Sequence, residues 1–156
     1  ECYDLWSCNN LYWYLTHACS PVTDGLMPYR EADLLRNILD RADAALKEGK
    51  NQATLRFGHE SCLLPLVALL ELNHYGESYP DVEKLSEQWR AYDIFPMASN
   101  VQFVFFHKKG SNDVLVKVLL NEKETKLPVK TDVAPYYHWK DVESYYREKL
   151  DKYQHI

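Results

Sequence analysis

The sequence predicts an α/β fold in which helices pack on a partial sheet, made of a central strand and a hairpin. Residues 52–58 alternate apolar and polar side chains, as a strand does, and the apolar run over residues 63–72 is long enough for a buried helix. Residues 101–107 and 114–120 are two apolar runs separated by a polar loop, the pattern of a β-hairpin. Helical periodicity over residues 31–48 indicates a helix that can cover the sheet.

Length and charge limit the classes of protein that fit. The chain has 156 residues, enough for one hydrophobic core. Its net charge of −5 provides no basic field for nucleic acid or acidic lipid, so an anionic ligand would have to be bound by local groups. The longest apolar run is interrupted by Pro65 and ends at Glu71, so no membrane-spanning segment is predicted. Because the chain starts at Glu1 without a methionine, we expect a leader or a larger piece to have been removed.

The first fifty residues predict two helices. Aromatic side chains recur at helical spacing over residues 4–16 without interleaved basic residues, so we expect them to pack in the core or at an interface rather than on nucleic-acid bases. Residues 20–29 contain two prolines and a glycine and predict a loop. Residues 31–48 carry one apolar stripe, and Gly49 can end this helix in the left-handed conformation.

In the middle of the chain, the central strand is predicted to turn into the buried helix. Gly58 allows a sharp turn, and His59 and Glu60 follow it at once. Pro65 lies near the helix start. The first four N–H groups of a helix have no intrahelical partner, so this proline is expected to remove little.

The C-terminal half predicts the hairpin and two further helices. Residues 81–91 indicate a short helix between a loop at 73–80 and an irregular stretch at 92–100. Residues 101–107 are apolar on both faces, which is typical of a strand covered on both sides, and 125–127 is expected to add a third short strand. The last helix follows Pro135, and its apolar stripe is Trp139, Val142, Tyr146, Leu150 and Tyr153.

These elements do not make a complete sheet. One isolated strand and one hairpin leave too many unpaired edges, and strands that are apolar on both faces need neighbours and covering helices. We therefore expect further strands to come from another chain or from another part of this protein.

The turn between the central strand and the buried helix is the candidate site. A helix start presents free N–H groups and the positive end of the helix dipole, which favours an anion such as phosphate. A cationic His59 can bind a phosphate oxygen, and a protonated Glu60 can donate a proton to a departing oxygen. The alternative interpretation is a solvated His-Glu pair in a loop, because this pair alone is a weak motif.

Neither the cysteines nor the remaining histidines predict a metal site. The cysteine spacing matches no zinc or redox motif, so we expect small buried residues rather than ligands. The cysteines are Cys2, Cys8, Cys19 and Cys62. The other histidines are dispersed, without a pair four residues apart, so satisfied or exposed side chains are favoured over ligands. These histidines are His17, His74, His107, His138 and His155.

The stretch LRFGHES at residues 55–61, followed by LLPLVALL, resembles the second catalytic motif of the histidine acid phosphatases. The resemblance is closest to the branch that contains the multiple inositol polyphosphate phosphatases. Three downstream segments support it: MASNVQFVFF at 97–106, DVLVKVLLNEKETKLP at 113–128 and APYYHW at 134–139. The resemblance implies that residues 1–50 are helices from the end of the family's α-helical insertion. Residues 51–156 would then be the C-terminal part of its α/β core.

The resemblance also implies the chemistry. In this family, the histidine of an N-terminal RHGxRxP motif attacks phosphorus and becomes phosphohistidine, and arginines bind the phosphate oxygens. A second histidine also contacts the phosphate, and a following acidic residue protonates the leaving alcohol. On this sequence, His59 corresponds to the second histidine and Glu60 to the acid. Arg56 could also reach the phosphate, although pairing with a neighbouring acid is the more common role for such an arginine.

Two features depart from the family's pattern. The inositol polyphosphate branch usually has its acid two places after the histidine, where this chain has Ser61. No histidine of the chain is followed by glycine, so the RHGxRxP nucleophile and its phosphate clamp are absent.

The resulting hypothesis is that the chain is the C-terminal portion of a phosphatase that hydrolyses phosphomonoesters. Inositol polyphosphates or phytate are the favoured substrate. The isolated 156 residues would be inactive without the missing N-terminal part of the same protein. The resemblance implies no metal or other cofactor, and a periplasmic or secreted location. The alternative is a non-catalytic module that binds a partner through its aromatic N-terminal segment or an open sheet edge.

Overall fold

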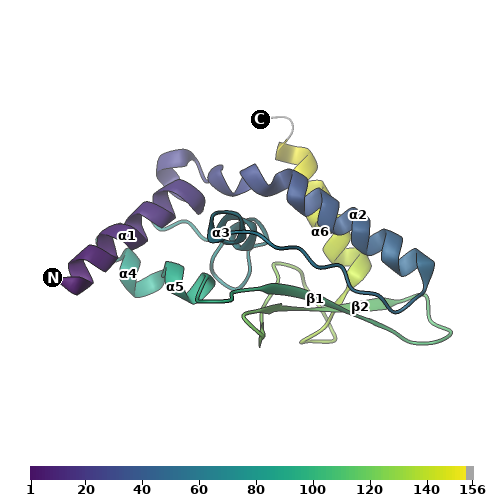
Figure 1. Cartoon of the computed structure of the whole chain (residues 1–156). Coiled ribbons are helices and arrows are strands. Elements are labelled where there is room, and N and C mark those ends of the chain that lie inside the picture. Colours follow the sequence, from purple (N-terminus) through teal and green to yellow (C-terminus); the bar gives the residue numbers. More distant parts are fainter. Residues whose placement is uncertain (154–156) are drawn as a thin grey trace.

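The computed structural model describes residues 1–153 of the chain. The helices are α1 (Cys2–His17), α2 (Ala32–Glu48), α3 (Glu60–Leu69), α4 (Leu85–Gln88), α5 (Ala91–Ile94) and α6 (Trp139–Tyr153), with 3₁₀ turns η1 (Pro21–Thr23) and η2 (Met27–Glu31). The strands are β1 (Val101–His107), β2 (Val114–Leu120), β3 (Lys123–Glu124) and β4 (Tyr137–His138). Figure 1 shows α3 in the middle, between a group formed by α1, α4 and α5 and the pair α2 and α6.

The two N-terminal helices are confirmed. Leu35 and Leu39, on the predicted stripe of α2, are fully buried, and Gly49 ends the helix with a φ of 64°. In α1, Tyr14 is buried and its ring packs edge-on against Trp89, so part of the aromatic segment lies in the core as expected.

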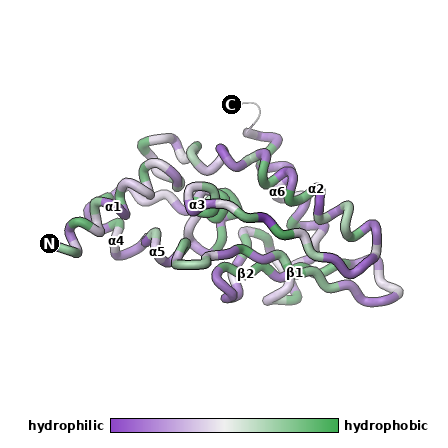
Figure 2. Tube along the Cα trace, viewed as in Figure 1, coloured by the Kyte–Doolittle hydropathy of each residue, from purple (hydrophilic) through white to green (hydrophobic). Residues whose placement is uncertain are grey.

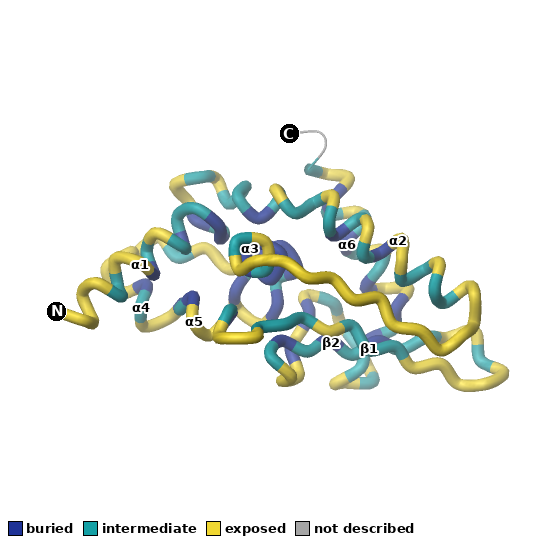
Figure 3. The backbone as a smooth tube through the Cα atoms, in the orientation of Figure 1, coloured by how far each residue is buried: buried dark blue, intermediate teal, exposed yellow. Residues whose placement is uncertain are grey.

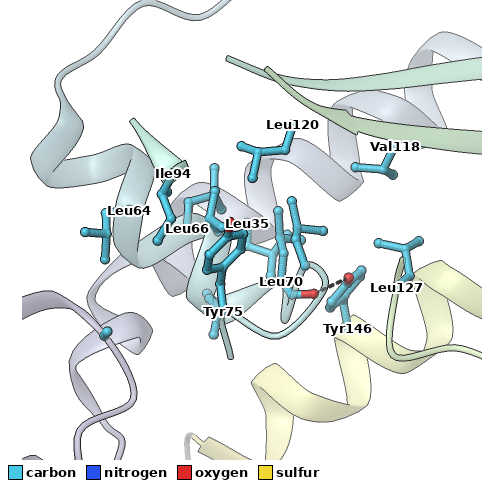
Figure 4. Packing of buried hydrophobic residues seen from close by; sticks show 14 of the residues in the cluster. Leu35, Leu64, Leu66, Leu70, Tyr75, Ile94, Val118, Leu120, Leu127 and Tyr146 are labelled. Atoms are coloured by element: carbon cyan, nitrogen blue, oxygen red, sulfur yellow. Dashed lines mark hydrogen bonds between the residues drawn. The ribbon is translucent and has the colours of Figure 1, made fainter. Parts of the chain in front are cut away.

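Helix α3 forms the centre of the core. Its residues from Leu64 to Leu69 are all buried, which explains why the run is apolar on every face (Figure 2). Its side chains pack toward β2 and α6 (Figure 4). The helix starts at Glu60, so Pro65 lies in its second turn rather than near its start. The proline therefore leaves the Ser61 carbonyl without the usual donor four residues later.

Polar contacts join α2 to α6. The Arg147 guanidinium lies 2.9 Å from carboxylate oxygens of both Asp40 and Asp43, and 2.7 Å from Glu143. The Trp139 indole N–H donates to Asp43 at 2.8 Å. The polar side of α2 thus contacts α6 as well as solvent, and the predicted apolar stripe of α6 is buried from Trp139 to Leu150.

The sheet is small and antiparallel. Strand β1 pairs with β2 from Val101 opposite Leu120 to His107 opposite Val114, and β3 and β4 pair with the other edge of β2. Within residues 1–153, β1 has no second neighbour, so one of its edges is open. The expectation that β1 is covered on both faces holds only in part, because Phe106 remains 40% exposed.

The predicted strand at residues 52–58 is wrong for this chain. The segment that joins α2 to α3 has no strand pairing, and Figure 3 shows it exposed along its whole length. Leu55 is 76% and Phe57 95% exposed. The alternating pattern is present, but a strand is defined by a hydrogen-bonded neighbour, and none of the described residues pairs with this segment.

Two predictions in the C-terminal half also need correction. Instead of one helix over 81–91 there are two short helices, α4 and α5, separated by an extended Trp89 (φ −137°, ψ 130°). The third strand is β3 at 123–124, not 125–127, because Asn121 and Glu122 adopt positive φ values of 51° and 65° and make a two-residue hairpin turn. Strand β4 was not predicted.

The cysteines are less buried than expected. Cys2, Cys8 and Cys62 are exposed and Cys19 is half-buried, and none of the four is in a disulfide. Cys2 and Cys8 lie on the solvent side of α1, and Cys62 lies in the exposed first turn of α3. Burial raises the pKa of the Cys19 thiol to about 11.

Candidate active site

His59 and Glu60 lie at the start of α3. His59 is the N-cap residue in an extended conformation (φ −109°, ψ 164°), and its carbonyl accepts from the N–H groups of Cys62 and Leu63, both at 3.0 Å. Glu60 begins the helix, so its N–H and that of Ser61 precede the first hydrogen-bonded turn. The structure thus places His59 and Glu60 as consecutive residues at the exposed, amide-rich start of α3.

Both side chains of this pair face solvent. Residues 51–60 are all exposed, and the His59 side chain makes no capping hydrogen bond. Two open surface cavities, of about 220 and 200 Å³, are lined by other residues. The first of these lies at the opposite end of α3, beside Leu69. Neither of these two cavities includes His59 or Glu60.

Arg56 does not join His59 and Glu60 in this structure. Its guanidinium donates to the Asn37 side-chain oxygen on α2 at 2.7 Å. This bond and a 3.1 Å bond from the Gln52 side chain to the Ala45 carbonyl attach the exposed segment to α2. The predicted phosphate contact of Arg56 stays a prediction, and it would require this side chain to leave Asn37.

One carboxyl near the helix start was not singled out from the sequence. The Glu31 carboxyl, in η2, lies near the Cys62 side chain in the first turn of α3, because η2 packs against this helix. Burial raises the pKa of Glu31, although the neighbouring Arg30 and Cys62 oppose this. The packing of η2 against α3 brings residues 31 and 62 together, and no local sequence pattern could have linked them.

Three of the remaining histidines have hydrogen-bond partners, and His74 is exposed. The His17 ring bonds the Thr16 hydroxyl at 2.6 Å, and the His107 ring bonds the Ser111 carbonyl at 2.8 Å. His138 lies between two aspartates, and His155 is outside the described residues. Across residues 1–153, no three histidine, cysteine, aspartate or glutamate side chains come together in a way that could hold a metal ion.

With this geometry established, comparison with known proteins identifies the family. The sequence profile of the histidine phosphatase superfamily (branch 2) matches residues 29–121, which include α3 and the hairpin. The chain belongs to this superfamily. The predicted family is thereby confirmed, together with the α/β fold class.

Two curated relatives of this histidine phosphatase chain are named as inositol polyphosphate phosphatases. It is 28% identical over 134 residues to human multiple inositol polyphosphate phosphatase 1, covering 78% of the chain and 27% of the human protein. It is 27% identical over 135 residues to the chicken enzyme of the same name, covering 75% of the chain and 28% of that protein. The chain thus spans little more than a quarter of the length of these relatives.

Solved structures of a bacterial relative have the same fold. The multiple inositol polyphosphate phosphatase of Bifidobacterium longum, in complex with inositol hexasulfate, matches with a TM-score of 0.65 and 26% identity, covering 76% of this chain and 25% of that one. The apo form matches with a TM-score of 0.75 and 24% identity, covering 89% and 30%. No helix within residues 1–153 of the histidine phosphatase chain is long and apolar enough to cross a membrane.

Proposed function

We propose that this chain is the C-terminal portion of a phosphomonoesterase that hydrolyses inositol polyphosphates, such as phytate, through a phosphohistidine. The observation that supports the proposal is the exposed His59–Glu60 pair at the start of α3, inside the region matched by the family. The free amides and the helix dipole favour a phosphate in front of α3, and a cationic His59 would bind one of its oxygens. Arg56 would add a second positive charge after leaving Asn37.

Glu60 is the proposed proton donor. A nucleophilic histidine forms a bond to phosphorus while the bond from phosphorus to the alcohol oxygen breaks, and the Glu60 carboxyl gives its proton to that oxygen. The Glu60 carboxylate then accepts a proton from the water that hydrolyses the phosphohistidine, which restores both groups. In this chain no histidine is followed by glycine, so the nucleophile comes from residues outside these 156.

The missing N-terminal part of the same protein is the proposed partner. The open edge of β1 and the exposed residues 51–60 are the surfaces that it would cover. Residues 1–50 would then be the end of the helical insertion and 51–156 the C-terminal part of the phosphatase core. By analogy with the usually exported family, we place the protein in the periplasm or outside the cell.

The test compares the complete polypeptide with residues 1–156, using phytate as a poor leaving group and p-nitrophenyl phosphate as a good one. We expect turnover only by the complete protein. Glu60→Gln should reduce phytate hydrolysis by about a hundredfold or more and reduce p-nitrophenyl phosphate hydrolysis much less, because only the poor leaving group needs the proton. His59→Ala should impair both substrates.

His74→Ala, at an exposed histidine beyond the other end of α3, is the matched control. Equal losses with both leaving groups in Glu60→Gln would show that Glu60 is not the acid. Turnover by residues 1–156 alone would contradict the proposal that the nucleophilic histidine lies outside these residues. A complete protein that binds a partner but hydrolyses no phosphomonoester would favour the non-catalytic module.

A further inference from the structure

Helix α3 carries the candidate site at one end, and α6 holds its other end. The last carbonyls of a helix have no intrahelical donor. In α3, the backbone N–H groups of residues 70–72 return to carbonyls of Leu66, Ala68 and Val67, which leaves the carbonyls of Leu69 and Leu70 to be satisfied. Both are satisfied by side chains of α6.

Three successive residues at this end of α3 are bonded from α6. The Lys149 ammonium donates to the Leu69 carbonyl at 2.7 Å, and the Tyr146 hydroxyl donates to the Leu70 carbonyl at 2.8 Å (Figure 4). The Glu71 carboxylate accepts from the Tyr145 hydroxyl at 2.5 Å and lies 3.1 Å from the Lys149 ammonium.

These bonds lie in a setting that strengthens them. Tyr146 is fully buried and Lys149 mostly so, and a positive charge at a helix C-terminus is favoured by the helix dipole. Burial raises the pKa of both Tyr146 and Tyr145 above the ordinary tyrosine value, so both hydroxyls remain donors at assay pH. Glu71 has a φ of 53°, and Gly76 packs closely against its backbone and side chain.

The site end of α3 is held by fewer hydrogen bonds to the rest of the chain, although η2 packs against the helix. The preceding residues 51–60 are exposed, and among them only the Gln52 and Arg56 side chains attach this segment to α2. Apolar packing around α3 resists lateral movement of the helix. It fixes the position of the helix along its own axis less well, because apolar contacts are not directional. Hydrogen bonds are directional, so those from α6 fix the axial position.

We propose that Tyr146 and Lys149 are positioning residues, which set the location of His59 and Glu60 by fixing the far end of α3. The catalytic part of this inference rests on the proposed function. The two side chains touch no substrate. They act through a short helix of about 15 Å, which transmits an axial shift from one end to the other.

The first measurement uses residues 1–156 and hydrogen exchange of the α3 amides. Tyr146→Phe removes the bond to the Leu70 carbonyl, and Lys149→Met removes the bond to the Leu69 carbonyl together with the ion pair to Glu71. Both changes keep most of the packing. We expect exchange in α3 to rise about tenfold, the equivalent of one net hydrogen bond, and to rise more than in α1 or α2. Lys152→Met, on the exposed side of α6, is the matched control and should change nothing. Unchanged exchange in α3, or a uniform increase over the whole chain, would overturn the proposal.

The second measurement uses the complete protein and compares kcat for phytate and p-nitrophenyl phosphate. A displaced Glu60 should lower kcat for phytate about tenfold more than for p-nitrophenyl phosphate in Lys149→Met, and Lys149→Arg should restore most of it. Equal losses for both substrates would overturn the positioning role. If the wild-type protein hydrolyses neither substrate, the proposed function fails, and the exchange experiment alone decides whether α6 fixes α3.

Discussion

At the scale of single residues, Asn10 shows how one buried polar side chain shapes its surroundings. It lies in α1 and is 1% exposed. Its side-chain amide donates to the Trp89 carbonyl at 3.0 Å, and its oxygen accepts from the Ala91 N–H at 2.8 Å. Asn10 thus supplies partners for backbone groups between α4 and α5, which allows the chain to be extended there instead of helical.

Replacing this residue has a predictable cost. Asn10→Ala would leave a buried carbonyl and a buried N–H without partners, and we expect the free energy of unfolding to fall by about 1–3 kcal/mol. The measurement is urea unfolding of residues 1–156, followed by tryptophan fluorescence. Asn9→Ala changes an exposed neighbour on the same helix and should have an effect below about 0.5 kcal/mol. Similar effects for the two variants would contradict this role of Asn10.

At the scale of elements, His138 joins parts of the chain that are distant in sequence. One ring nitrogen lies 3.0 Å from the Asp113 carboxylate, just before β2, and the other lies 2.9 Å from Asp132. The hydrogen bonds with Asp132 and Asp113 raise the pKa of His138, and the bond from His138 lowers the pKa of Asp132. When protonated, the imidazole connects β4 to the start of β2 and to the loop between them.

The sign of the resulting pH dependence follows from the raised pKa of His138. Its stabilisation is fully present below the ordinary histidine pKa of about 6.5 and is lost as pH rises through the higher folded pKa. We expect the urea midpoint of the wild type to exceed that of His138→Asn near pH 6, and the difference to shrink as the pH rises through the raised pKa of His138.

The matched control for this test is His107→Asn, whose ring bonds the Ser111 carbonyl instead of carboxylates. A difference between wild type and His138→Asn that grows with pH would contradict the assignment. Below about pH 4, Asp132 becomes protonated as the pH falls through its lowered pKa. The difference in urea midpoint between wild type and His138→Asn should then disappear as well.

At the scale of the whole molecule, the chain exposes surfaces that folded proteins normally cover. Phe57 is 95% and Met97 99% exposed, and Leu55 lies near Phe57 on the unpaired segment before α3. One edge of β1 has no neighbour within residues 1–153. Exposed apolar side chains and an open strand edge are both recognised routes to association.

We therefore expect residues 1–156 to self-associate as concentration rises. The double change Leu55→Ser and Phe57→Ser should shift the sedimentation-velocity distribution toward monomer, because it removes apolar area without touching the core. Val82→Ser, at another exposed apolar side chain, should leave the distribution unchanged. A wild-type chain that stays monomeric at all concentrations would show that these surfaces are not adhesive.

Several elements could be predicted because their signals are local. The stripe of α2 and its terminal Gly49 mark that helix within one stretch of sequence, and the β1–β2 hairpin has two apolar runs around a polar loop. The candidate pair His59 and Glu60 could be found in the same way, because the two residues are neighbours in the sequence and the turn before α3 places them. Residues 52–58 carry an equally clear alternation, yet a strand also needs a partner, and periodicity contains no information about partners.

The sequence by itself determined the family, the main helices, the hairpin and the adjacent imidazole and carboxyl, because periodicity, capping residues and short motifs act over a few residues. Only the tertiary structure decided that Asn10 separates α4 from α5, that Glu31 reaches the first turn of α3, and that Tyr146 and Lys149 hold its last turn. These contacts join residues about 30 to 80 positions apart, and they form only where packing brings together groups that no local pattern connects.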